Sequence, residues 1–366
     1  MIIMDIKIDN FYCFKNFQLN MSYPKKIVDS TIQHEYLEDR PNFRYKKVNI
    51  LMGGNATGKT SLGKMLMLFA NYFDNENASM FKKVINDRRK PASLSIDFVT
   101  NENTLYRFSL SMRLESEDVF GDNLSMNIQA TDIGLRDNYE TCAKRIDVGE
   151  CREVEMEEVN LEGWSFSYPA DMYINKTYYS IENDSQYLSI LERILKTLDP
   201  SIDKVIKMEE VENTYAIKIG NKSVIIQEGK ILDTEILSSG TKAGLDISYI
   251  IASLVCDMHE LYYCDEIFSY VNSDIEKACL SIIIEKLTQR KQLFFTTHNT
   301  DILDMQLPKH SFTFLKKDIK NFDKPIQCIN AGDYLKRNTD CLKNAVENDL
   351  FSAAPELEQL YAIAEY

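Results

Sequence analysis

The feature that most constrains this chain is a short glycine-containing run near residue 53. An apolar, β-prone segment, residues 48–52, ends at Gly53; four residues intervene, and Gly58, Lys59 and Thr60 follow. This is the full phosphate-binding loop (P-loop) pattern, in which a strand leads into the loop and a helix leaves it. The chain is therefore expected to fold around a strand, a loop and a helix that together bind a phosphate group.

Each residue type in this run has its own chemical task. Glycines let backbone N–H groups wrap around a β-phosphate, and the positive end of the following helix dipole points at the same anion. Lys59 can reach the β- and γ-phosphates, and the Thr60 hydroxyl can ligate Mg²⁺. The predicted nucleotide-binding residues of the loop are Gly53, Gly54, Asn55, Ala56, Thr57, Gly58, Lys59, Thr60 and Ser61.

Composition narrows the class of protein. The 366 residues are 44% hydrophobic and 27% charged, which suits a soluble globular chain with one large core or two modest ones. The net charge of −14 argues against a general polyanion binder, although a local basic groove is compatible with it. Residues 79–90 hold the densest basic cluster, so contact with nucleic acid stays an open alternative.

The cysteines and the amino-terminal residues indicate the cellular compartment of the protein. The eight cysteines form no C-x-x-C pair, and several lie in apolar runs, so we expect reduced, buried thiols. We expect no signal peptide, because Asp5 follows the first four residues at once, and no apolar run approaches the ~20 residues that span a bilayer. These features predict a cytoplasmic protein without a membrane partner.

Hydrophobic periodicity predicts the local structure. Alternating apolar residues from Ile2 and the run 17–20 indicate an amino-terminal β-hairpin, and residues 21–44 are expected to form a surface loop. The P-loop helix is expected from about 58 to 72. Further expectations are strands at 93–99 and 104–111, an acidic insertion at 113–165, an amphipathic helix at 185–198, and a meander at 205–208, 215–219 and 223–227.

A second stretch, Ile236 to Lys242, precedes a helical run at 243–258. Ser238, Ser239 and Gly240 offer an N-cap hydroxyl and backbone N–H groups, which again suit a phosphate. Most Ser-Gly helix starts are plain caps. This stretch therefore gains its meaning from the motifs that follow it.

Two further apolar runs end in polar residues. Residues 261–264 lead into Asp265 and Glu266, the Walker B pattern, in which Asp265 holds Mg²⁺ through water and Glu266 polarises the attacking water as general base. Residues 292–297 lead into His298, which is placed to touch a γ-phosphate. The predicted catalytic residues are Glu266, His298 and Lys59, and the predicted metal-binding residues are Thr60 and Asp265.

The order of these motifs resembles the ABC-type ATPase superfamily. Leu237-Ser238-Ser239-Gly240-Thr241 stands where that superfamily has its Leu-Ser-x-Gly-Gln signature. Asn272 stands where its D-loop usually has Asp or His. The glutamine of its Q-loop has only Gln129 and Gln186 as candidates.

Within the superfamily, the chain looks most like the stand-alone AAA/ABC ATPases related to the OLD and RloA-type proteins of prokaryotic phage defence. The Gly-Gly-Asn-Ala-Thr-Gly-Lys-Thr loop and the Phe-Thr-Thr-His-Asn-Thr-Asp-Ile-Leu run carry this resemblance, together with the opening hairpin and the carboxy-terminal segment. It covers residues 1–72 and about 230–355. It specifies nucleotide chemistry strongly and biological role only weakly.

The resemblance implies an α/β fold in which a mixed sheet is flanked by helices, with an antiparallel β lobe and an inserted α+β lobe. Residues 1–112 and 231–366 would be the two halves of an ATPase head, and residues 113–230 the inserted lobe. ATP and Mg²⁺ would be the cofactors. Two protomers would close head to tail on two ATP molecules, so we expect a homodimer or a higher homo-oligomer.

Three functions compete at this point. The favoured one is an ATP-hydrolysing switch that senses a phage cue and controls a separate effector, such as a nuclease or a toxin. The second is a DNA-repair ATPase of the SMC or RecF kind, although the acidic charge and the lack of a long coiled coil count against it. The third is the nucleotide-binding subunit of a transporter, against which the long insertion counts.

Overall fold

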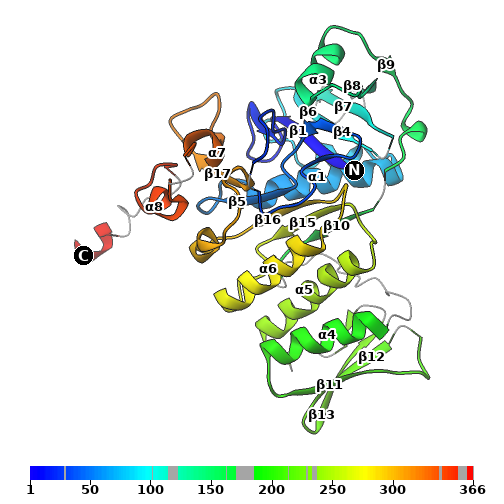
Figure 1. Cartoon of the computed structure of the whole chain (residues 1–366), viewed down its shortest axis with the longest axis vertical. Helices are drawn as coiled ribbons and strands as arrows, with labels where there is room; N and C mark the ends of the chain where they lie inside the picture. The colour runs from blue at the N-terminus through cyan, green and yellow to red at the C-terminus, as the bar shows by residue number, and fades with distance from the viewer. Residues whose placement is uncertain are drawn as a thin grey trace. The chain divides into compact units, whose positions relative to one another are not determined.

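The computed structural model describes residues 1–28, 30–100, 102–113, 123–161, 163–169, 185–212, 214–227, 230–232, 237–337, 340–352 and 361–365 (Figure 1). The chain divides into two compact units. The first unit comprises Met1–Phe166, Glu260–Tyr263 and Thr288–Tyr366, and the second comprises Ser167–His259 and Cys264–Leu287. Each unit is described by itself below.

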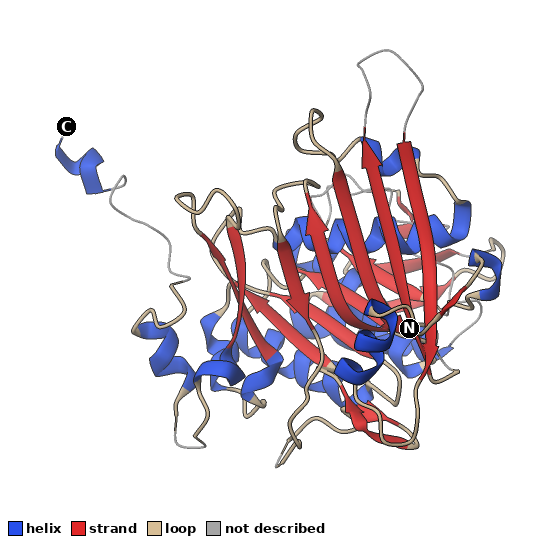
Figure 2. Cartoon of the chain, turned by 90° about the horizontal axis from the view of Figure 1, so that it is seen from above, coloured by secondary structure: helices blue, strands red, loops and turns tan. Residues whose placement is uncertain are grey.

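An antiparallel sheet forms one layer of the first unit. Its described strands are ordered β2-β1-β6-β7-β8-β9, and they run side by side in Figure 2. The expected amino-terminal hairpin and the two strands that follow the P-loop helix are confirmed. The bounds are β1 Ile2–Asp9, β2 Phe17–Asn20, β6 Ala92–Val99, β7 Thr104–Arg113, β8 Asn123–Asp132 and β9 Arg152–Glu153.

A mixed sheet forms the second layer, with described strands in the order β10-β15-β16-β5-β17-β18. The P-loop strand β5 is central and fully buried, and it runs parallel to both β16 and β17, whereas β18 is antiparallel to β17. Burial on both faces explains the continuous apolar run before Gly53. The bounds are β5 Val48–Met52, β10 Trp164–Ser167, β15 Leu261–Asp265, β16 Gln292–Thr296, β17 Phe312–Lys317 and β18 Ile326–Asn330.

Helix α1, Lys59–Asn75, lies in the core between these two sheets. Phe69 on its buried face packs edge-on against Phe98 and Phe108 of the antiparallel sheet, with ring centroids 5.5 and 5.2 Å apart. The same core cluster contains Leu51 and Phe294 of the mixed sheet. The predicted P-loop helix and the α/β fold with helices flanking a mixed sheet are therefore confirmed.

Two polar segments are more structured than their composition predicted. Residues 21–44 contain the strand pair β3, Tyr36–Leu37, and β4, Arg40–Arg44, because Leu37 and Phe43 enter a small core of their own. The acidic region after β7 adds β8, helix α3 (Tyr139–Asp147), β9 and the 3₁₀ turn η1 (Met156–Glu158) to the first unit. The three-part division 1–112, 113–230 and 231–366 stays a prediction.

Short helices complete the first unit. They are α2 Ser79–Lys82, α7 Ala331–Tyr334 and α8 Leu342–Glu347, with 3₁₀ turns η2 Thr300–Asp304, η3 Lys309–Ser311 and η4 Ala362–Glu365. Gln292 fastens β1 to the mixed sheet: its buried amide accepts from Ile3 N at 2.8 Å and donates to Ile3 O at 3.0 Å. Among the described residues, no helix has both the length and the apolar character needed to cross a bilayer.

The second unit combines helices with a small antiparallel sheet, and it confirms the predicted helix and meander. Its elements are α4 Ser185–Leu198, α5 Ser239–Val255, α6 Ser273–Lys286, β11 Ile202–Lys207, β12 Thr214–Ile219, β13 Lys222–Gln227 and β14 Lys230–Ile231. Tyr187, Leu191 and Leu195 form the buried face of α4. Gly244 lets α5 approach this helix closely, because a Cβ there would lie 2.5 Å from the Leu198 side chain.

Candidate nucleotide-binding site

The loop between β5 and α1 adopts a conformation that depends on its glycines. Gly53 has φ 152° and Gly58 has φ 100°, both in a region that L side chains rarely adopt. A Cβ at Gly53 would lie 2.5 Å from the Leu315 carbonyl oxygen, and one at Gly58 would lie 2.9 Å from the Phe14 ring. Backbone angle and available space therefore both require glycine at these two positions.

A hydrogen bond within the loop fixes its turn, and the residues at its tip are exposed to solvent. The Thr57 hydroxyl donates to the Gly54 carbonyl at 2.9 Å, which fixes the turn. Asn55 and Ala56 are exposed at the crest, and Ala56 is itself left-handed, with φ 59°. The loop thus presents its backbone to solvent, as binding an anion through N–H groups requires.

Helix α1 begins without a side-chain cap and without an acidic residue in its own first turn. Gly58 is the N-cap and provides no side-chain cap hydrogen bond, and the first turn contains no acidic residue. Thr60 and Ser61 in this turn are half-buried. An anion beyond the loop would therefore meet the helix dipole directly.

Lys59 is folded back over the loop. Its Nζ lies 2.9 Å from the Gly53 carbonyl oxygen, 3.4 Å from that of Gly54 and 3.1 Å from His298 Nε2, and the residue is only 5% exposed. An anionic phosphate would bind the ammonium more strongly than an uncharged carbonyl oxygen does. The lysine is held where the P-loop pattern predicts it.

The structure places His298, one of the predicted site residues, next to the P-loop lysine, although the two are far apart in the sequence. It follows β16, the parallel neighbour of β5, so its exposed ring stands at the same end of the sheet as the loop. The contact suits a lysine that donates to an unprotonated Nε2, which assigns the imidazole proton to Nδ1. Its predicted contact with a γ-phosphate stays a prediction.

Asp265 is the last residue of strand β15 and Glu266 follows it directly; both fall in the second unit. Asp265 is fully buried, and Glu266 is half-buried and left-handed, with φ 48°. The Glu266 carbonyl accepts from both the amide and the hydroxyl of Ser269, which fixes the turn after the strand. Asn272 ends this turn as the N-cap of α6, and its side chain accepts from the Asp274 amide at 2.8 Å.

The signature stretch lies at the start of α5. Ser238 is the N-cap: its side chain accepts from the Thr241 amide at 3.1 Å and lies 2.8 Å from the Thr241 hydroxyl. Ser239 is exposed, and a Cβ at Gly240 would lie 3.1 Å from the Tyr270 carbonyl oxygen. The capping geometry is confirmed, whereas contact of Ser238, Ser239 and Gly240 with a nucleotide stays a prediction.

The structure thus gathers the P-loop residues, Lys59 and His298 in the first unit, and it holds the signature, Asp265 and Glu266 in the second. Assembly of the complete set around one nucleotide stays a prediction. Of the Q-loop candidates, Gln129 lies in β8 opposite Arg107, and Gln186 lies in the first turn of α4.

Several supporting residues were not predicted from sequence. Tyr263 on β15 donates to the Lys59 carbonyl at 2.6 Å, and its ring fills the space where a Cβ on Gly63 would stand. Cys13 lies beside Gly58; burial raises the pKa of its thiol, while a hydrogen bond with Ser61 opposes that shift. These contacts join segments that are far apart in the sequence, so no local sequence pattern predicts them.

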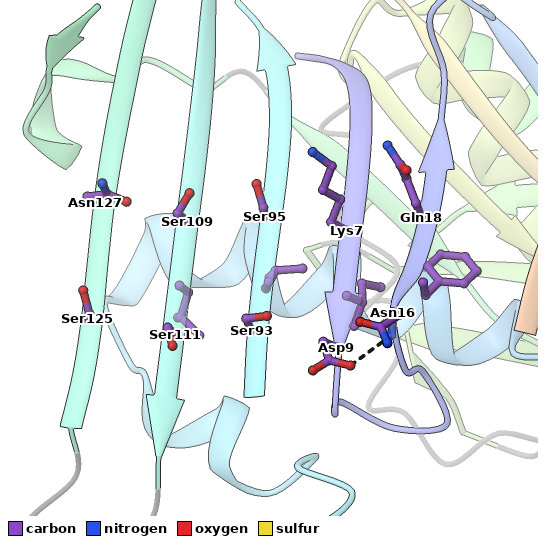
Figure 3. A pocket seen from close by; sticks show the side chains of 14 residues that line it. Lys7, Asp9, Asn16, Gln18, Ser93, Ser95, Ser109, Ser111, Ser125 and Asn127 are labelled. Carbon is purple, nitrogen blue, oxygen red and sulfur yellow. Dashed lines mark hydrogen bonds between the residues drawn. The ribbon is translucent and has the colours of Figure 1, made fainter. Parts of the chain in front are cut away.

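A groove of about 480 Å³ lies elsewhere, on the outer face of the antiparallel sheet (Figure 3). Short polar side chains from β6, β7 and β8 line it, with Lys7 and Gln18 along one side. It contains none of the predicted nucleotide-binding or catalytic residues. It is therefore a separate surface of the first unit.

The P-loop on a central parallel strand, the helix behind it and the antiparallel lobe together have the fold of an ABC-type P-loop ATPase head. Two solved structures share this fold. An Smc head bound to the C-winged helix domain of ScpA is 13% identical with a TM-score of 0.50, covering 90% of this chain and 98% of that chain. A Smc head domain with an extended coiled coil, bound to the C-terminal domain of ScpA from Pyrococcus furiosus, is 10% identical with a TM-score of 0.51, covering 92% and 98%.

A sequence family matches residues 48–304, which is more than half of the chain, and its description reads "AAA domain, putative AbiEii toxin, Type IV TA system". The chain belongs to this AAA family. No curated protein matches it. The narrower resemblance to OLD and RloA-type proteins stays a prediction.

Proposed function

We propose that this protein binds ATP with Mg²⁺ and hydrolyses it as a nucleotide-driven switch. In this proposal the P-loop backbone and Lys59 hold the β- and γ-phosphates, Glu266 orients and deprotonates the attacking water, and His298 contacts the γ-phosphate. The observation that carries the proposal is the position of the Lys59 ammonium, 2.9 Å from Gly53 O and 3.1 Å from His298 Nε2 over an open glycine loop.

The donor set fits a magnesium ion. Thr60, the second residue of α1, supplies a hydroxyl, and Asp265 supplies a carboxylate that is fully buried at the end of its strand. Oxygen donors of this kind, completed by water and phosphate oxygens, are what Mg²⁺ takes in nucleotide sites. When bound, the ion would neutralise the charge that develops between the β- and γ-phosphates.

The switch is proposed to work as a homodimer. Each nucleotide would lie between the P-loop of one protomer and the signature of its partner, so that ATP closes the assembly and hydrolysis opens it. The exposed Ser239 at the start of α5 is available for such a contact. The family description, which names a toxin and a type IV toxin–antitoxin system, supports a defence role in which the switch controls a separate toxin or nuclease.

Two variants test the nucleotide chemistry. Lys59→Ala should lose ATP affinity in calorimetry because the charge facing the phosphates is removed. Glu266→Gln should retain ATP and Mg²⁺ but lower the turnover number by about 10²–10⁴-fold, the usual contribution of a general base. Unchanged ATP binding by Lys59→Ala would refute the P-loop assignment, and wild-type turnover by Glu266→Gln would mean that another residue is the base.

The switch and its biological role need separate tests. Glu266→Gln should elute earlier than wild type in size-exclusion chromatography with ATP, because the closed assembly accumulates. Expressed together with its neighbouring reading frames, the wild-type protein should reduce phage plaque formation and Lys59→Ala should not. Equal plaque counts for both would refute the defence role while leaving the ATPase assignment intact.

A further inference from the structure

The hairpin between β17 and β18, residues 318–325 (the hairpin tip), displays two large apolar side chains to solvent. Phe322 is 80% exposed and Ile319 is 69% exposed. The same stretch of sequence contains four lysines and two aspartates: Lys316, Lys317, Lys320, Lys324, Asp318 and Asp323. The whole chain has a net charge of −14, so a segment that combines exposed apolar side chains with several lysines differs from its overall acidic character.

The hairpin tip is a built structure. The Asn321 amide donates to the Asp318 carbonyl at 3.1 Å, and the Asp318 carboxylate accepts from the Lys320 amide at 3.0 Å. The turn between β1 and β2 holds it from outside: Lys15 Nζ donates to the Phe322 carbonyl, and Asn16 Nδ2 donates to the Asp323 carbonyl at 2.9 Å. Phe322 is therefore presented on a fixed backbone.

The same turn connects the hairpin tip to the groove on the antiparallel sheet. Asn16, which binds the hairpin tip, also lines the groove, and Figure 3 shows it beside Asp9 at one end. The strands are in register there, so that Ser95 faces Ser109 and Ser93 faces Ser111. The hairpin tip, the turn and the groove thus form one continuous surface of the first unit, which we call the track.

The floor of the groove offers unused hydrogen-bonding groups. Within the part of the chain that the structure describes, the side chains of five serines and one asparagine here have no hydrogen-bond partner: Ser93, Ser95, Ser109, Ser111, Ser125 and Asn127. Lys7 stands at its side; its side chain is 51% exposed, and its Nζ lies 3.6 Å from the Asp5 carboxylate. Residues 88–90, all basic and exposed, lie just before Ser93, where Asn10 Nδ2 holds the Asp87 and Lys90 carbonyls at 2.8 and 3.1 Å.

This set of groups matches one chemical class of partner. Lysine, serine, asparagine and glutamine side chains are the usual donors to phosphate and sugar oxygens, and an exposed aromatic ring is the usual platform for an unpaired base. A duplex hides its base faces, so it would leave Phe322 without a stacking partner. An acidic peptide would satisfy the lysines but would have no need of the hydroxyl-lined floor.

We infer that the track binds a single-stranded nucleic acid. Phe322 stacks on a base, Lys317 and Lys320 face the phosphates beside it, and the serine-lined floor receives the continuing sugar-phosphate backbone. Because recognition is by stacking and phosphate contacts, binding is tolerant of sequence and depends on salt.

The test measures fluorescence anisotropy of a labelled oligothymidylate of about 20 nucleotides, long enough to cover one such surface. Phe322→Ala should weaken binding roughly 5- to 150-fold, the value of one stacked base. Lys317→Ala with Lys320→Ala should lower the salt slope by roughly 0.7 for each phosphate that is no longer neutralised. Ser109→Asp should weaken binding by repulsion, and Ser109→Ala should weaken it less.

Matched variants control for general effects. Leu135→Ala removes an apolar side chain that is 70% exposed outside the track, and Lys25→Ala with Lys26→Ala removes two exposed lysines outside it. Both should bind the oligonucleotide as wild type does. Lys59→Ala should also bind normally without ATP, because the track contains no P-loop residue, so this result is independent of the proposed ATPase function.

Three results would overturn the inference. Equal affinity for the oligothymidylate and for its duplex with oligoadenylate would exclude single-strand recognition. A normal affinity of Phe322→Ala, with weaker binding only in the lysine variant, would reduce the hairpin tip to a general polyanion patch. Displacement of the oligonucleotide by polyglutamate at equal charge concentration would assign the surface to an acidic protein.

Discussion

Helices α1 and α5 both begin beside a glycine, but their first turns meet their hydrogen-bonding needs in opposite ways. At α1, Gly58 is a left-handed N-cap without a side-chain hydrogen bond, and the first turn has no acidic residue. At α5, the Ser238 hydroxyl already accepts from the Thr241 amide at 3.1 Å and contacts the Thr241 hydroxyl at 2.8 Å. The first start has no side-chain cap, and the second is capped by its own residue.

The difference indicates how the two helices would contribute to a nucleotide site. An uncapped helix start with an open loop gains most from a bound phosphate, since its N–H groups otherwise depend on water. A self-capped start loses little without a ligand, so it is stable by itself and suits a surface that is engaged only when a partner protomer arrives. The predictions below test this contrast in order of decreasing effect.

The largest effect is expected when subunits with a substitution in α1 are mixed with subunits that have a substitution in α5. Lys59→Ala and Gly240→Asp should each be inactive as homodimers, because every site then lacks a P-loop charge or carries an acid facing the phosphate. After random exchange, about half of the dimers are mixed and each has one intact site of two, so roughly a quarter of wild-type ATPase should return if the sites act independently. Phosphate release by the exchanged mixture is the measurement.

Absence of recovery after verified subunit exchange would contradict independent sites acting in trans. Crosslinking from the region of Ser239 to an ATP analogue bound by a tagged partner protomer then separates two explanations. A crosslink to the partner's nucleotide means that both sites must fire together. A crosslink only within one protomer means that the signature acts in cis.

Gly58→Ala should destabilise the start of α1 for two reasons: an unfavourable backbone angle and a steric clash. The left-handed angle costs about 1–3 kcal/mol for a residue other than glycine, and a Cβ would also meet the Phe14 ring at 2.9 Å. Gly149→Ala is the matched control, because Gly149 has φ 79° but no atom within 4 Å of an added Cβ. Thermal unfolding should show the larger loss for Gly58→Ala, and ATP affinity should fall only in that variant.

The two helices also contain a matched pair of packed glycines. A Cβ on Gly63 of α1 would lie 2.4 Å from the Tyr263 ring, and one on Gly244 of α5 would lie 2.5 Å from a terminal methyl of Leu198. A leucine end can move, whereas the tyrosine ring is held by its bond to the Lys59 carbonyl. Gly63→Ala should cost about 1–3 kcal/mol, as overpacking usually does. Equal losses of unfolding free energy in the two variants would contradict this account.

The smallest effect should follow loss of the α5 cap. Ser238→Ala should lower the free energy of unfolding by about 1 kcal/mol, and Ser238→Asp should preserve it because aspartate caps equally well. Hydrogen exchange at the first turn of α5 measures the local change. If the hydroxyl also serves a nucleotide, Ser238→Asp should keep its stability but lose ATPase activity; normal ATPase would limit Ser238 to a cap.

The features that could be predicted from sequence were those with a local pattern. Gly53 to Thr60 fixes a strand, a loop and a helix by spacing alone, and α4 follows from a stripe of apolar residues. Residues 123–158 were not predicted because polar strands show weak hydrophobic alternation; β8 is ordered by pairing with β7, and β9 by pairing with β8. Phe14 beside Gly58 and Tyr263 beside Gly63 required knowledge of long-range contacts that no local pattern contains.

The position of β5 in its sheet has a consequence for how the protein folds during its synthesis. Its two neighbours, β16 and β17, begin at Gln292 and Phe312, so both arrive on the ribosome long after the P-loop itself has been synthesised. Pairing over such separations is slow to form and leaves strand edges unprotected meanwhile. The nascent chain therefore contains a complete P-loop motif before the mixed sheet that flanks β5 can form, and a ribosome stalled before residue 292 should hold a chain unable to retain ATP.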